Sequence, residues 1–132
     1  MAKKNLVVFG FDTLFTPDSS AIASWADPIL DSEKVLKVFI ASDSEPCFEW
    51  PKVFMLGSRT LFLGHCISTT QSRDDCFRLL ANLIRLICME HDVHRKFFFA
   101  GSQADFAAGN NFGLTSVLVN GQAILPEQFL LV

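Results

Sequence analysis

The chain has no tyrosine, no Cys-x-x-Cys pair and no apolar run of membrane-spanning length. Its aromatic residues are 14 phenylalanines and 2 tryptophans, which offer apolar area with few hydrogen-bonding groups and so favour packing in a core. The apolar run at residues 6–9 is too short for a signal peptide or a membrane span, and Asp12 follows it. We therefore expect a soluble cytoplasmic protein that does not bind a membrane.

A basic stripe is also missing. The net charge is −3, and acids and bases are mixed along the chain, which argues against a nucleic-acid-binding surface. Half of the residues are hydrophobic, enough to bury a core, and a length of 132 residues suits one domain. We expect a single domain over residues 1–132; the sequence leaves a protein partner or a homo-oligomer open.

The four cysteines are Cys47, Cys66, Cys76 and Cys88. In a chain without a signal peptide we expect free thiols. Cys47, Cys66 and Cys76, together with His65, are the residue types that bind zinc, but their spacing is irregular. The sequence favours small buried hydrophobic residues at these positions and leaves zinc binding open.

Continuous apolar runs indicate the strands. Residues 6–9, 38–41, 97–100 and 114–119 are predicted strands, and 53–56 with 60–63 predict a hairpin or two neighbouring short strands. Because these runs lack polar alternation, we expect a parallel sheet that is covered on both faces.

Apolar spacings of three and four residues predict a long helix over 72–90, with Cys76, Phe77, Leu80, Leu83, Ile84, Ile87 and Cys88 on its buried stripe. A short helix is predicted over 103–108, ended by residues 109–111. We also expect a helix from Ser19 or Ser20 to about Ala26, ended or bent by Pro28, and a further helical turn at 31–33. An apolar tail at 126–132 should dock on the domain. Strands alternating with helices indicate an α/β fold with a mainly parallel central sheet.

Polar residues follow three of the predicted strands. They are Gly10, Asp12, Thr13 and Thr16 after the first, Ser42, Asp43 and Ser44 after the second, and Gly101, Ser102, Gln103 and Asp105 after the strand at 97–100. Ligands of parallel α/β sheets bind beyond the carboxyl ends of the strands, so we expect the three clusters to converge on one crevice. Backbone amides and hydroxyls there suit an anion such as phosphate.

Three segments resemble motifs of the haloacid dehalogenase-like (HAD-like) hydrolases. Residues 9–15, Phe-Gly-Phe-Asp-Thr-Leu-Phe, resemble the opening motif Phe-Asp-x-Asp-Gly-Thr-Leu, and residues 40–44 resemble the second motif, a strand ending in Thr or Ser. Residues 99–119 look like the closing segment, Gly-Asp-x-x-x-Asp followed by Ala-Gly, Ala-Gly and an apolar strand. The chain is as short as capless members such as histidinol-phosphate and heptose-bisphosphate phosphatases. The resemblance implies a three-layer α/β/α sandwich of HAD-like (Rossmannoid) type without a cap domain.

The family's chemistry needs an aspartate nucleophile, a second aspartate two residues later as general acid/base, and another acid that completes a Mg²⁺ site. In one alignment Gly10 replaces the nucleophile and Asp12 keeps the acid/base position. In the other, Asp12 is the nucleophile and Leu14 replaces the acid/base. Ser102 stands where the closing motif has a metal-binding acid, and Asp105 remains.

On this pattern Asp12 is the catalytic candidate, and Asp12 and Asp105 are the candidate metal ligands. The candidate phosphate-binding residues are Thr13, Ser42, Asp43 and Ser102. The family's phosphate-binding lysine has no clear counterpart; the basic residues to consider are Arg73, Arg78, Lys52 and Lys96.

Three functions follow from these observations. The favoured one is a non-catalytic binding or regulatory protein that keeps a phosphatase fold and binds a small phosphorylated ligand, with no cofactor. The alternative is a divergent Mg²⁺-dependent phosphatase that hydrolyses a small phosphomonoester through Asp12. The third is a different α/β fold, flavodoxin-like or receiver-like, which a different strand order would reveal.

Overall fold

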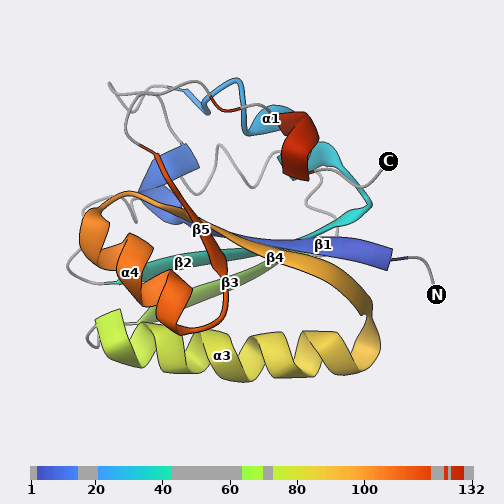
Figure 1. Ribbon diagram of the computed structural model, residues 1–132. Coiled ribbons are helices and arrows are strands. Elements are labelled where there is room, and N and C mark those ends of the chain that lie inside the picture. The colour runs from blue at the N-terminus through green and yellow to red at the C-terminus, as the bar shows by residue number, and fades with distance from the viewer. Residues whose placement is uncertain are drawn as a thin grey trace.

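The computed structural model describes residues 3–14, 21–42, 64–69, 73–119, 124 and 126–129. Its elements in chain order are β1 (Lys3–Gly10), the 3₁₀ helix η1 (Phe11–Leu14), α1 (Asp27–Asp31), β2 (Val35–Ser42), β3 (Gly64–Thr69), α3 (Arg73–Glu90), β4 (Asp92–Ala100), α4 (Gln103–Asn111), β5 (Thr115–Leu118) and the 3₁₀ helix η2 (Pro126–Phe129). Strands and helices share one α/β unit (Figure 1).

The five strands form one sheet in the order β3-β2-β1-β4-β5, and every pairing is parallel. β1 lies at the centre, where Phe9 pairs with Phe39 of β2 and with Phe99 of β4. A parallel sheet, as the apolar runs predicted, is thus confirmed. Flavodoxin-like and receiver-like domains have the order 2-1-3-4-5, so the described strands contradict that alternative.

Successive residues of β1 point to opposite faces of the sheet and enter two separate cores. Val7 and Phe9 pack with α1 and η2, whereas Leu6 and Val8 pack with α3. Figure 1 shows α3 and α4 on one face and α1 and η2 on the other. Because both faces are covered, the runs at residues 6–9, 38–41 and 97–100 carry apolar residues at successive positions rather than at alternate ones.

The core under α1 and η2 is built from aromatic rings. Phe9 stacks between Phe39 and Phe99, with ring centroids 5.5 and 5.3 Å away. Trp25 and Phe129 each lie 4.8 Å from the ring of Phe99. Phe129 is buried, which confirms the predicted docking of the tail for the described residues 126–129.

The long helix and the helix after β4 are confirmed, since α3 and α4 match the predicted ranges within a few residues. On α3, Phe77, Leu80 and Ile87 are buried as expected. Cys88 is exposed and free, so its predicted place on the buried stripe is wrong, although the predicted free thiol is correct. No helix among the described residues is long and apolar enough to cross a membrane.

The predicted helix ending at Pro28 is wrong. Residues 21–26 form a bend, a bridge and a turn, and α1 begins at Asp27 with Pro28 in its first turn. Proline lacks the N–H that a helix interior needs, but first-turn amides have no intrahelical acceptor, so the same residue starts a helix as readily as it ends one. Asp31, expected to open another helical turn, is the last residue of α1.

Two strand predictions also need correction. β3 was not predicted, because Gly64–Thr69 is a mixed polar segment; it is an edge strand among those described. β4 begins at Asp92, five residues before the apolar run. The predicted strands at 53–56 and 60–63 lie outside the described residues, as do Cys47 and Lys52.

Candidate functional site

The carboxyl ends of β1, β2 and β4 lie at one edge of the sheet, where η1 and α4 begin (Figure 1). β1 sits between them: the chain passes from β1 to β2 on one side and returns from β3 to β4 on the other. This reversal is a topological switch point, the place where doubly wound sheets leave a ligand-binding crevice. The predicted convergence of the three polar clusters is therefore supported by the topology.

Thr13 links the ends of β1 and β4. It is 7 % exposed, and its hydroxyl donates a 2.6 Å hydrogen bond to the carbonyl of Gly10. A Cβ added at Gly10 would lie 3.7 Å from the Thr13 methyl group, and one added at Gly101 would lie 3.5 Å from it. The Thr13 methyl group thus packs against both glycines and closes the gap between the two strand ends.

Gly10 also marks a close approach of β1 to β4. A Cβ at this position would meet the backbone oxygen of Phe99 at 3.3 Å, which is tighter than ordinary van der Waals contact. The last residue of β1 therefore has no side chain where the first alignment requires the nucleophilic aspartate.

Ser102 begins α4. Its backbone is extended, and its hydroxyl oxygen accepts a 3.2 Å hydrogen bond from the amide of Asp105. This is the geometry of a helix N-cap, which satisfies one of the first-turn donors. The Ser102 hydroxyl hydrogen is not used in this bond, so it can be donated to a ligand at the same edge.

The structure brings five of the candidate residues to this edge by backbone position. Thr13 lies in η1, Ser42 ends β2, Ser102 caps α4 and Asp105 lies in the first turn of α4. Asp12 lies in η1 as well, but its side chain and that of Ser42 are not among those described. Asp43, Ser44 and Thr16 lie outside the described residues.

Metal ligation stays a prediction. Among the described residues no three His, Cys, Asp or Glu side chains gather into a metal-sized group. The candidate zinc ligands Cys47, His65, Cys66 and Cys76 and the carboxylates of Asp12 and Asp43 are not part of that description.

No described basic side chain replaces the family's phosphate-binding lysine. Lys96 pairs with Leu6 in the amino-terminal half of β4, away from the carboxyl edge. Arg78 lies on the exposed side of α3, and the side chain of Arg73 is not described. Among the described residues, the groups that could hold a ligand at this edge are therefore hydroxyls and backbone amides.

A buried lysine in β2 was not predicted from the sequence. Lys37 of β2 is fully buried, and its Nζ donates to the carbonyl oxygens of Ser32 and Val35 at 2.6 and 3.1 Å. Burial lowers the pKa of Lys37 from 10.5 to about 8, while nearby Asp31 raises it and Lys4 lowers it further. These carbonyls lie at the start of β2, so Lys37 holds the connection from α1 rather than the candidate site. A lysine within an apolar run is the signal that was overlooked.

Similarity to known proteins assigns no family to this chain. It matches no protein-family profile, no curated protein and no solved structure. The residues at the carboxyl edge therefore carry the functional inference.

Proposed function

We propose that this protein is a HAD-like domain that binds a small phosphorylated ligand without hydrolysing it. The strand order β3-β2-β1-β4-β5 is that of the first five strands of the Rossmann arrangement, which supports a Rossmannoid, three-layer α/β/α sandwich. Since many functions share such folds, the chemistry at the carboxyl edge decides between a binder and an enzyme.

The observation that carries the proposal is that two expected acids are replaced there. Gly10 ends β1 without a side chain and cannot attack phosphorus. Ser102, in place of a metal-binding acid, has its hydroxyl oxygen engaged as the cap of α4. The family's magnesium site draws on these acids, and neither Gly10 nor Ser102 has a carboxylate to supply to it.

Donor groups nevertheless remain for an anion. The Ser102 hydroxyl hydrogen is available, and the amides of Gln103 and Ala104 start α4, where backbone N–H groups have no intrahelical acceptor. Thr13 is a weaker candidate because its hydroxyl already donates to Gly10 and would have to give up that bond. The proposed ligand group is thus a phosphate held by Ser102 and the start of α4.

Turnover tests the catalytic half of the proposal. We expect purified protein with Mg²⁺ to hydrolyse p-nitrophenyl phosphate no faster than buffer, and Asp12→Asn to change nothing. Turnover by the wild type that is abolished in Asp12→Asn would instead establish the divergent phosphatase acting through Asp12.

Calorimetric titration with inorganic phosphate tests the binding half, using two Ser102 variants that both keep a good cap. Ser102→Asn keeps a neutral hydrogen-bonding side chain, so we expect its phosphate affinity to fall no more than a few-fold. Ser102→Asp adds a negative charge at the ligand, and its affinity should fall by about tenfold or more, the equivalent of 1.4 kcal/mol. Equal phosphate affinities in the two variants would show that the anion does not bind at Ser102.

A further inference from the structure

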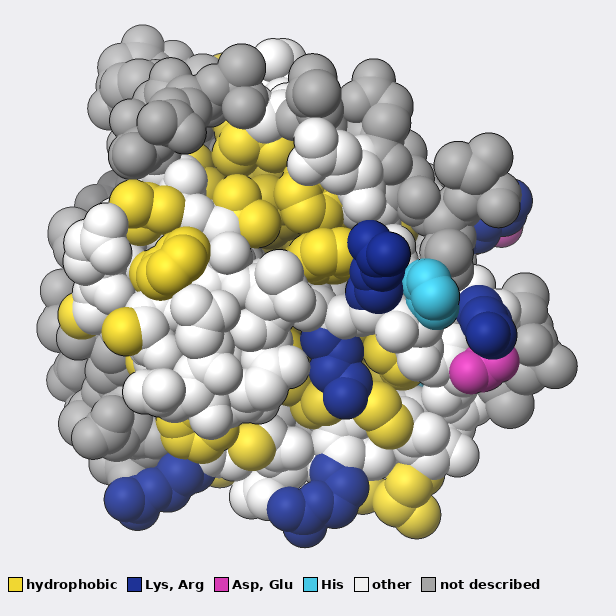
Figure 2. Space-filling view, viewed as in Figure 1, with side chains coloured by type: hydrophobic (Ala, Val, Ile, Leu, Met, Phe, Trp, Pro, Cys, Tyr) yellow, Lys and Arg dark blue, Asp and Glu magenta, His cyan; other side chains and the backbone are white. Residues whose placement is uncertain are grey.

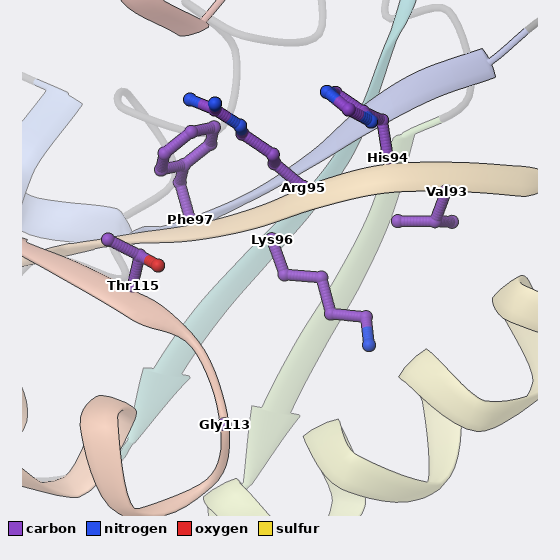
Figure 3. A pocket seen from close by; sticks show the side chains of 7 residues that line it. All are labelled: Val93, His94, Arg95, Lys96, Phe97, Gly113 and Thr115. Atoms are coloured by element: carbon purple, nitrogen blue, oxygen red, sulfur yellow. The ribbon is translucent and has the colours of Figure 1, made fainter.

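A second hollow of the structure lies beside the amino-terminal half of β4. β4 spans Asp92–Ala100, but β5 pairs with it from Phe97 to Ala100, so residues 92–96 have no described strand beside them on that side. The result is a hollow of about 420 Å³, the basic notch, lined by Val93, His94, Arg95, Lys96, Phe97, Gly113 and Thr115 (Figure 3). The far wall is the turn from α4 to β5.

Charge in the basic notch has one sign. Its lining contains Arg95, Lys96 and His94 and no acidic residue. Figure 2 shows lysine or arginine side chains and a histidine gathered on this side of the molecule, with an acidic side chain beside the outermost basic one. His94 and Arg95 are exposed and Lys96 is partly exposed, so these groups can meet a ligand.

A β-bulge sets the directions of these side chains. Lys4 of β1 pairs with Val93 and Leu6 pairs with Lys96, so three steps along β4 match two along β1. The extra residue places His94 and Arg95 on the same face of the sheet, while Lys96 points to the other face (Figure 3). Because the cations flank the strand edge from both faces, one small anion cannot contact all of them.

We propose that the basic notch binds an extended acidic segment of a partner protein, which adds as a short strand beside residues 93–96. Unpaired backbone groups at a strand edge supply hydrogen bonds to such a segment. Side chains of an added strand alternate between the faces, so consecutive acids would reach Arg95 on one face and Lys96 on the other. The five open residues, 92–96, are about 17 Å long, enough for a segment of about five residues.

Fluorescence anisotropy with a labelled heptapeptide, Thr-Val-Glu-Glu-Glu-Val-Thr, tests this proposal. We expect saturable binding to the full chain. The combined change Arg95→Glu and Lys96→Glu should weaken binding at least about tenfold. Arg85→Glu makes the same kind of charge change at an exposed position of α3 and should leave binding unchanged. If the double variant does not fold, Arg95→Gln with Lys96→Gln gives a milder loss in the same direction.

A second peptide separates strand addition from charge attraction. The same heptapeptide with N-methylated glutamates keeps its charge but loses backbone donors, so it should bind at least about tenfold more weakly. Equal binding of the methylated peptide, or an equal loss in Arg85→Glu, would overturn the proposal. The proposal would also be overturned if the chain dimerised without peptide and the combined change Arg95→Glu and Lys96→Glu abolished the dimer. A second copy of the chain would then occupy the notch.

Discussion

The two halves of β4 pair with the same neighbour, β1, yet differ in burial, in charge and in pairing with β5. Phe97, Phe98, Phe99 and Ala100 are buried, between 0 and 7 % exposed, with α4 and β5 beside them. Residues 92–96 are exposed or partly exposed, bulged and mostly charged. The difference shows that pairing with β1 alone does not bury a strand of this sheet, and that β5 and α4 complete the burial of Phe97–Ala100. The covered half ends at the proposed ligand site, and the other half, which has no described strand on its outer side, is where we propose that a partner binds.

The covered half should carry most of the stability. We expect Phe99→Ala to lower the free energy of unfolding by about 3–5 kcal/mol, because it removes a fully buried ring that packs against Phe9, Trp25 and Phe129. Val93→Ala, a partly buried residue of the uncovered half, should lose clearly less. Urea denaturation measures the free energy of unfolding of both variants. Equal losses would show that the two halves of β4 contribute equally to stability.

The packing of α4 on this half is the next largest effect. A Cβ on Gly109 would lie 2.5 Å from the Ser116 Oγ and closer still to the ring of Phe98. We expect Gly109→Ala to cost about 1–3 kcal/mol, since α4 must shift away from β4. Gly101→Ala is the control, because its Cβ would meet Thr13 at an ordinary 3.5 Å. A Gly109→Ala variant as stable as the Gly101→Ala control would contradict the close packing.

Lys37 of β2 is a buried basic residue, in contrast to the exposed or partly exposed basic residues of β4. The pKa of Lys37 is about 8 in the folded chain and 10.5 when unperturbed, so between these pH values the unfolded chain binds more protons. Stability from this group therefore rises as pH increases from about 8 to 10.5, and below pH 8 the cost of burying the charge is present in full. We expect Lys37→Met to flatten this part of the stability profile and the exposed Lys34→Met to leave it intact. A profile unchanged in Lys37→Met would refute the assignment.

The smallest effect is expected in the basic notch. Arg95 is exposed and lines the notch, so Arg95→Gln should change the free energy of unfolding by less than about 0.5 kcal/mol. The same variant should still weaken binding of the acidic heptapeptide. A loss of stability comparable with that of Phe99→Ala would show that this half of β4 is structural instead.

The covered half could be predicted from sequence and the uncovered half could not. Phe97–Ala100 is an apolar run with one physical explanation, burial on both faces. Asp92–Lys96 is mostly polar, and it is a strand because β1 pairs with it. The local sequence pattern could not reveal this tertiary pairing. It also could not reveal that Pro28 lies in the first turn of a helix rather than at its end.

The meeting of the strand ends at the candidate site could be predicted from the sequence, but the contacts of single side chains could not. Parallel strands bring their carboxyl ends together, so the convergence of Gly10, Ser42 and Gly101 followed from sequence alone. The roles of single hydroxyls did not follow. Whether Thr13 donates to Gly10 and whether Ser102 caps α4 depend on distances of a few ångströms between groups in the folded chain.

Amide NMR of the ¹⁵N-labelled protein, titrated with inorganic phosphate, tests the binding claim most directly because it reads both ends of β4 at once. We expect saturable shifts at Gly101, Ser102, Gln103 and Ala104, with none of comparable size at 93–96. Shifts centred on His94–Lys96, or none at the start of α4, would contradict a phosphate site at the carboxyl edge of the sheet.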